Sequence, residues 1–286
     1  MTEIKPLKEL TLLDKFLFDK VIENPEAHEA MLRIIFEDDE YNLLDKTQTE
    51  KELTTAPWLR SIRLDVFSID ENKRIINTEM QQTYRNDLVK RSRFYQALFD
   101  SSLLEPGIIS YNTLNDTVII MITPFDLFGQ GRYKYTFVTK CIENNNVQFP
   151  DGCVKIFLNT RGTNDDETNP ELVKLLHYIE NTNSFEIDPN SNDNLLKLQG
   201  IVDKVQSSEE MGVKYMQKWE EDILLKEQGK AEGLAEGKAE GIAEATDEAV
   251  RKTIASLKKY NVSREDIIEE ISTSYPDYAD KVADLL

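Results

Sequence analysis

The sequence predicts an α/β protein, built on a mixed β-sheet flanked by helices and followed by a long helical extension. Short runs with period-two alternation, typical of strands, recur between residues 58 and 160. A helix-like stretch at 86–104 interrupts them, and alternation of strands and helices is typical of a mixed sheet. Beyond Leu195 the pattern becomes helical and stays so to about Lys259.

The elements are expected in a definite order. Residues 1–56 are expected to be helical, because apolar side chains recur at helical spacing around a break at Asn24-Pro25. A further helix is expected from Pro170 to about Ile179. Strands are expected at 60–70, 74–81, 108–112, 117–123, 134–141 and 154–159.

Three regions follow from these patterns. Residues 1–185 form the expected α/β domain. Residues 186–208 form a linker, rich in asparagine at its start, and the beginning of the helical region. Residues 209–286 form a helical extension that ends in a small helical module, where Ser263 begins a capping-box pattern.

The extension contains an octad written twice, from Gly229 to Glu244, with glycine at every fourth position. Each glycine destabilises a helix by about 1 kcal/mol relative to alanine, so a row of glycines along one side of a helix calls for a structural explanation. One reason is close approach of two helices in a homodimer. The alternative, which we favour because such packing is better supported in membranes than in water, is a low-complexity spacer helix.

Composition and charge narrow the class of protein. The 286 residues carry a formal charge of −19, which opposes DNA binding except through a local basic patch. The start lacks the apolar core of a signal peptide, and the longest apolar run, Val118–Ile122, is too short to span a membrane. The two cysteines, Cys141 and Cys153, have no metal-ligand spacing. We therefore expect a cytoplasmic protein without a membrane partner.

Two acidic residues, Asp65 and Glu79, lie in neighbouring strand-like runs joined by a turn signal. If the runs pair as a hairpin, the two carboxylates converge, and paired hard oxygens hold Mg²⁺ beside a phosphate. The alternative is that both acids face solvent. In an antiparallel hairpin the numbers of any two opposed residues add to the same sum. Asp65 and Glu79 lie opposite each other only if that sum is 144, which requires a connection with an odd number of residues, such as 71–73. A sum of 145 would set Met80 opposite Asp65. We expect the odd connection.

A basic cluster follows on the helix at 86–104. Lys90, Arg91 and Arg93 lie where a phosphate-bearing substrate could meet them, although such a cluster is also typical of a solvated helix face. We expect Arg91 to lie near the acidic pair and Lys90 and Arg93 to be exposed. The apolar residues Phe94, Tyr95 and Leu98 are expected to pack on the sheet.

A series of motifs resembles a known family. The motifs are LTLLDKFLFDKVIENPE, RLDVFSID, INTEMQ, KRSRFYQALFDSSLL, TPFDLFGQGRYKYTF and KIFLNTRG. In this order they resemble the recombination-promoting nuclease or putative transposase family of the PD-(D/E)XK phosphodiesterase superfamily, over residues 10–185. The resemblance implies a restriction-endonuclease-like core that acts on DNA as a metal-dependent endonuclease.

The resemblance also implies roles for individual residues. Asp65, Glu79 and the backbone carbonyl of Met80 would bind Mg²⁺ or Mn²⁺, and Gln81 takes the position that lysine usually holds. An amide can orient water but carries no charge, so Lys90 or Arg91 would supply the cation. With Arg93, these two would contact DNA. The alternative is a non-catalytic DNA-associated or oligomerising protein on the same fold, and a carboxylate occupied by a salt bridge would favour it.

Overall fold

The chain forms two compact units, Met1–Met216 and Gln217–Leu286. The computed structural model describes residues 4–44, 48–53, 62–103, 109–189 and 191–286, and gives only the backbone for 48–53, 62–65 and 103.

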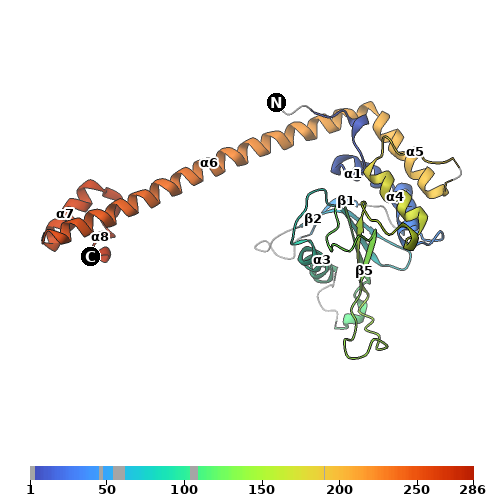
Figure 1. Cartoon of the computed structure of the whole chain (residues 1–286), viewed down its shortest axis with the longest axis horizontal. Coiled ribbons are helices and arrows are strands. Elements are labelled where there is room, and N and C mark those ends of the chain that lie inside the picture. Colours follow the sequence, from blue (N-terminus) through green and yellow to red (C-terminus); the bar gives the residue numbers. More distant parts are fainter. Residues whose placement is uncertain (1–3, 45–47, 54–61, 104–108, 190) are drawn as a thin grey trace. The chain divides into compact units, whose positions relative to one another are not determined.

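The first unit is organised around a mixed sheet (Figure 1). Within the described residues the sheet has six strands in the order β1-β2-β3-β4-β6-β5. The strands are β1 (Gln48–Leu53), β2 (Ile62–Ile69), β3 (Ile75–Met80), β4 (Thr117–Thr123), β5 (Lys134–Phe137) and β6 (Cys153–Asn159). The central strands β3, β4 and β6 are parallel, whereas β1, β2 and β5 join antiparallel. This confirms the predicted α/β fold with a mixed sheet.

Helices cover both faces of the sheet. One face packs against α1 (Lys15–Ile22), α2 (Pro25–Phe36), α4 (Pro170–Glu180) and α5 (Asp193–Ser207), and the other packs against α3 (Leu88–Leu103). Successive strand residues point to opposite faces. Ile76 therefore joins the first core, and Ile75 joins the core beneath α3. Glu79, an even number of residues from Ile75, belongs to the α3 face.

The helix starts follow the expected chemistry. Asn24 caps α2 by accepting hydrogen bonds from the amides of Glu26 and Ala27, with Pro25 in the first turn. Asn169 and Pro170 begin α4 in the same way. Such caps satisfy amides that have no partner inside the helix.

Several expected elements differ in the structure, and one of them is the continuous helix expected from Leu195 to about Lys259, which is interrupted at the extended Ser208. Residues 48–53 form strand β1, where a helix was expected, because they pair with β2. The expected strand at 108–112 is wrong where the structure describes it, since Tyr111–Thr113 is a short 3₁₀ turn. The expected strand at 134–141 ends at Phe137, where its pairing with β6 ends. The other 3₁₀ turns are Leu7–Glu9, Asp165–Glu167 and Pro276–Tyr278.

The range 186–208, expected as a linker and helix start, contains α5. Its Leu195, Leu198 and Val202 are buried in the first core. Met211 and Tyr215 also pack against that core, so the first unit includes the start of the next helix. The apolar side chains of α5 therefore form part of the core of the first unit, so this part of the range is not a linker.

The boundary between the units falls inside α6 (Glu209–Lys259). In the second unit the end of α6 packs with α7 (Arg264–Ser274) and α8 (Val282–Leu285) around Val250, Ile254 and Ile271. The Ser263 hydroxyl accepts a hydrogen bond from the Asp266 amide and caps α7. Among the helices described, none has a stretch apolar and long enough to cross a bilayer.

Candidate active site

The hairpin between β2 and β3 has the predicted register. Phe67 lies opposite Asn77, so paired positions sum to 144. The connection is the odd one, because Asp70 and Arg74 close residues 71–73 by a hydrogen bond between the Asp70 amide and the Arg74 carbonyl. Lys73 takes the left-handed conformation, with φ of 61°, that ends such a turn without glycine.

The same register, continued by one residue, sets position 65 opposite Glu79. Asp65 belongs to β2, and its side chain lies outside the described residues. The backbone thus brings together the two positions that the predicted metal site requires. The Glu79 side chain can be followed in detail.

Glu79 is buried, with only 2% of its surface exposed. Burial of a carboxylate is costly unless donors satisfy it. Oε1 accepts a hydrogen bond of 3.2 Å from the Asn77 amide nitrogen, and Oε2 accepts one of 3.0 Å from Arg91. The Tyr95 hydroxyl is 3.5 Å from Oε2. These donors hold the carboxylate on the α3 face of the central strand.

Arg91, in the first turns of α3, connects two predicted catalytic side chains, Glu79 in β3 and Gln81 just after it. One terminal nitrogen of its guanidinium donates to Glu79, and the other donates to the Gln81 side-chain oxygen at 2.9 Å. Its Nε donates to the Tyr95 hydroxyl, and the guanidinium lies over the Tyr95 ring. Arg91 therefore lies near the acidic position, as predicted, and brings positive charge there.

Gln81 follows the last residue of β3 and is half-buried. Its backbone amide still donates to Ile122 on β4, which keeps the residue in line with the strand. Its side-chain nitrogen donates to the Thr83 carbonyl at 2.7 Å. With its oxygen held by Arg91, the amide is fixed at both ends.

Asn77, beside Glu79 on the α3 face of β3, has a side-chain oxygen without a hydrogen-bond partner. The residue is fully buried, its amide nitrogen faces Glu79, and its Oδ1 is unpaired. A buried acceptor of this kind is rare unless water or an ion satisfies it. Among the described residues no group of three or more His, Cys, Asp or Glu could hold a metal ion. Any metal site here therefore needs amide or backbone oxygens, or Asp65.

The structure separates the other predicted residues from this cluster. Lys90 and Arg93 are exposed, as expected, and line a different pocket. The Met80 side chain lies in the core on the opposite face of the sheet, as strand alternation requires. Tyr95 and Leu98 pack on the sheet as predicted, but the expectation for Phe94 is wrong because 40% of its surface is exposed. It lies one position off the buried stripe.

Sequence reasoning did not identify Asn77, Tyr95 and Lys155 as functional candidates. The signal for Asn77 was its place two residues before Glu79, which puts both on one strand face. The signal for Tyr95 was its spacing of four residues from Arg91 on a helix. Lys155 is a charged residue inside an otherwise apolar strand, β6.

The mixed sheet with helices on both faces, and a buried acid on its central strand, defines a restriction-endonuclease-like α/β protein. The model of a family described as PD-(D/E)XK nuclease family transposase matches residues 15–228 of the chain. No curated protein and no solved structure matches it. Since the match covers most of the chain, the protein belongs to the PD-(D/E)XK nuclease family transposases. This membership indicates a nuclease-like function.

Proposed function

We propose that the protein is a metal-dependent DNA endonuclease of the recombination-promoting type. It would hydrolyse phosphodiester bonds of DNA in an active site formed by Asp65, Glu79 and Gln81. The observation that carries the proposal is the hairpin register, which sets position 65 opposite the buried Glu79. Two carboxylates on adjacent strands are a common support for a divalent ion beside phosphate. Family membership supports the same chemistry.

The residues present fit a hard divalent cation such as Mg²⁺ or Mn²⁺ in their chemistry. Glu79 supplies carboxylate oxygens, the Met80 carbonyl lies next to it in the chain, and Asn77 has an orphaned buried oxygen at the same surface. Asp65 would supply the second carboxylate. Such an ion, when bound, lowers the pKa of water and stabilises charge on a phosphoryl group.

The chain's own residues would orient the reactants. Gln81, held by Arg91 and Thr83, can present its amide to an attacking water but cannot remove a proton from it. Arg91 would supply the positive charge that the superfamily usually takes from lysine.

One observation favours a second candidate function. The ion pair between Arg91 and Glu79, at 3.0 Å, occupies a carboxylate oxygen that a metal would use. If this pair persists in the presence of metal, the protein is an eroded nuclease that binds DNA or oligomerises without cutting. The same contact therefore supports catalysis if Arg91 moves to phosphate, and opposes it if Arg91 stays.

Binding of Mn²⁺ separates the two candidates, and electron paramagnetic resonance measures it directly. We expect one site per chain that Asp65→Asn and Glu79→Gln each weaken by at least about tenfold, since even residues that only orient metal ligands are worth ~10–100-fold. Glu71→Gln, an exposed acid in the same hairpin, is the matched control. Mn²⁺ binding that is absent, or unchanged in both site variants, would favour the eroded protein.

The remaining assignments are proposals of the same kind. DNA is the proposed partner, contacted through Lys90, Arg91 and Arg93. A homodimer through α6 and a cytoplasmic location remain predictions, the second supported by two free cysteines, Cys141 and Cys153.

A further inference from the structure

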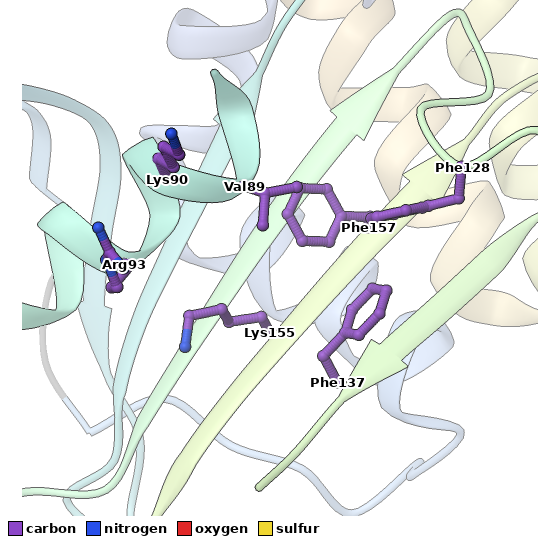
Figure 2. A pocket seen from close by; sticks show the side chains of 7 residues that line it. All are labelled: Val89, Lys90, Arg93, Phe128, Phe137, Lys155 and Phe157. Carbon is purple, nitrogen blue, oxygen red and sulfur yellow. The ribbon is translucent and has the colours of Figure 1, made fainter. Parts of the chain in front are cut away.

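A pocket of about 280 Å³ lies on the α3 face of the sheet (Figure 2). Its walls come from α3, from β5 and β6, and from the loop after β4. Three phenylalanines form its apolar side, and Phe128 contacts both of the others, with ring centroids 4.8 Å from Phe137 and 5.2 Å from Phe157. Val89 of α3 completes this side.

Three cations line the same pocket: Lys90 and Arg93 of α3, and Lys155 of β6. Figure 2 shows Lys155 extending from its strand toward α3. Among the residues that the structure describes, none of the three makes an ion pair. The neighbouring Arg91, by contrast, is paired with Glu79. In a chain of net charge −19, three unneutralised cations around one aromatic pocket are complementary to an anion with a flat apolar part.

The aromatic side of the pocket is held in place. Asp126 accepts hydrogen bonds from the Phe128 and Gly131 amides and from the Tyr135 hydroxyl, which ties the loop to β5. Phe137 lies opposite Lys155 in the β5–β6 ladder, so ring and ammonium stem share one face. Phe137 keeps 43% of its surface exposed, which leaves room for another flat group against it.

The pocket lies on the same side of the sheet as Glu79. Register sets Glu79 beside Met121, and Met121 beside Phe157, so Glu79 and Phe157 are two strands apart in one row. Two inter-strand spacings amount to about 10 Å. A strand of nucleic acid lying across the row would reach both places within a few nucleotides.

We infer that this pocket binds an unpaired nucleotide of a DNA strand, with its base stacked on Phe128 and Phe137 and its phosphates at Lys90, Arg93 and Lys155. Aromatic platforms beside a basic track are how proteins hold single strands without reading sequence. Bases within a duplex are already stacked and offer no free face. The inference deepens the proposed function, because it specifies the form of DNA held beside the site.

The test compares a fluorescein-labelled thymidine oligonucleotide of about 12 nucleotides with an abasic oligonucleotide of the same length. Anisotropy is measured with the full chain carrying Asp65→Asn, in excess chelator, so that the result is independent of cleavage. The wild-type pocket should bind the base-bearing strand roughly tenfold more tightly than the abasic strand, in line with stacking of one base.

The variants assign the preference to the pocket. Phe128→Ala with Phe137→Ala should remove it while leaving abasic binding unchanged, and Phe137→Ala alone, at an exposed strand end, should reduce it if the double variant does not fold. Lys155→Gln should weaken both probes about equally. Phe149→Ala, an exposed phenylalanine outside the pocket, is the control and should change neither.

Three results would overturn the inference. They are equal affinity of the wild-type pocket for both strands, a preference that survives in folded phenylalanine variants, and free thymidine monophosphate competing as well as the oligonucleotide. If base-dependent binding holds but metal-dependent cleavage is absent, the proposed endonuclease function fails and this pocket assignment stands.

Discussion

At the scale of single residues, the shared guanidinium of Arg91 governs what Glu79 and Gln81 can do. It donates to both side chains, at 3.0 Å and 2.9 Å, and so links the central strand to α3. A neutral residue at position 81 is compatible with this cation, whereas a lysine there would lie against it. The site therefore has its positive charge on a helix rather than on the strand.

A lysine at position 81 would place a positive charge at the end of the strand, and this gives a direct prediction. Gln81→Lys alone should lower metal-dependent cleavage, because two like charges about 4 Å apart cost roughly 1–4 kcal/mol in a partly shielded site. Adding Arg91→Gln should restore the rate to near the wild-type value. A double-mutant cycle on single-turnover rates measures the coupling. Additive effects of the two substitutions would show that the side chains act independently.

A buried histidine predicts how stability depends on pH. Burial of His28, whose ring nitrogen is 3.3 Å from the Thr78 hydroxyl, lowers its pKa from 6.5 to about 3. Below pH 6.5 the unfolded chain binds a proton that the folded chain does not, so stability falls as pH falls. At pH 5 this loss is about 2 kcal/mol.

Urea unfolding at pH 7.5 and pH 5 measures the effect. The wild-type protein should lose about 2 kcal/mol more between these values than His28→Gln does, because glutamine has no proton to gain. The comparison uses the pH difference within each protein, so a constant cost of the substitution cancels. Equal losses in both proteins would contradict the assignment to His28.

At the scale of elements, alternation along 63–70 and 74–81 was sufficient to predict both strands, but their register depended on the further expectation of an odd connection, which the structure confirms. Period two fixes which residues share a face, and the odd connection fixes which are opposed. The strand β1 could not be predicted in this way. Its sequence, Gln-Thr-Glu-Lys-Glu-Leu, is polar and rich in helix formers, and its conformation comes from pairing with β2.

The same distinction applies to the candidate site. The place of Arg91 beside Glu79 could be predicted, since α3 follows β3 after a short connection and the two residues are only 12 positions apart in the sequence. The free oxygen of Asn77 and the assembly of Lys155 with Lys90 could not, because they depend on how α3 lies across strands far away in the sequence. Local periodicity carries no information about that packing.

The start of α6 gives a prediction about truncation. A chain ending at Met216 retains Met211 and Tyr215, whose ring lies 5.1 Å from that of Phe16, and should fold and keep any metal-dependent cleavage. A chain ending at Ser208 loses both contacts. Their burial is worth about 2 kcal/mol, or roughly 4–8 °C in melting temperature for a unit of this size.

Calorimetry on the two truncated chains measures this difference, and light scattering on the full chain tests the homodimer. Apart from the helix's own neighbouring backbone, no described atom lies within 4 Å of the position that a Cβ atom would take at Gly229, Gly233, Gly237 or Gly241. If those glycines pack against a second copy, the full chain is dimeric and the chain ending at Met216 is monomeric. Equal melting temperatures for the two truncations would show that α6 adds nothing to the first unit.

At the scale of the whole molecule, charge and chemistry are distributed unevenly. The chain carries −19 overall, yet the α3 face brings three unpaired cations and the Arg91 guanidinium to one side of the sheet. DNA affinity that rests on so few cations should be weak, and it should fall with salt only as steeply as that small number of phosphate contacts allows. The second unit has a separate small core, and the proposed chemistry requires none of its residues.

The most direct test is cleavage of supercoiled plasmid with Mg²⁺ or Mn²⁺, comparing the wild-type protein with Asp65→Asn and Glu79→Gln. Each substitution should lower the rate by more than about 100-fold, because even groups that only orient metal ligands are worth ~10–100-fold. Glu71→Gln should cleave at the wild-type rate, and excess chelator should stop all activity. Cleavage that survives both site substitutions, or that persists in chelator, would contradict the assignment of phosphodiester hydrolysis to this hairpin.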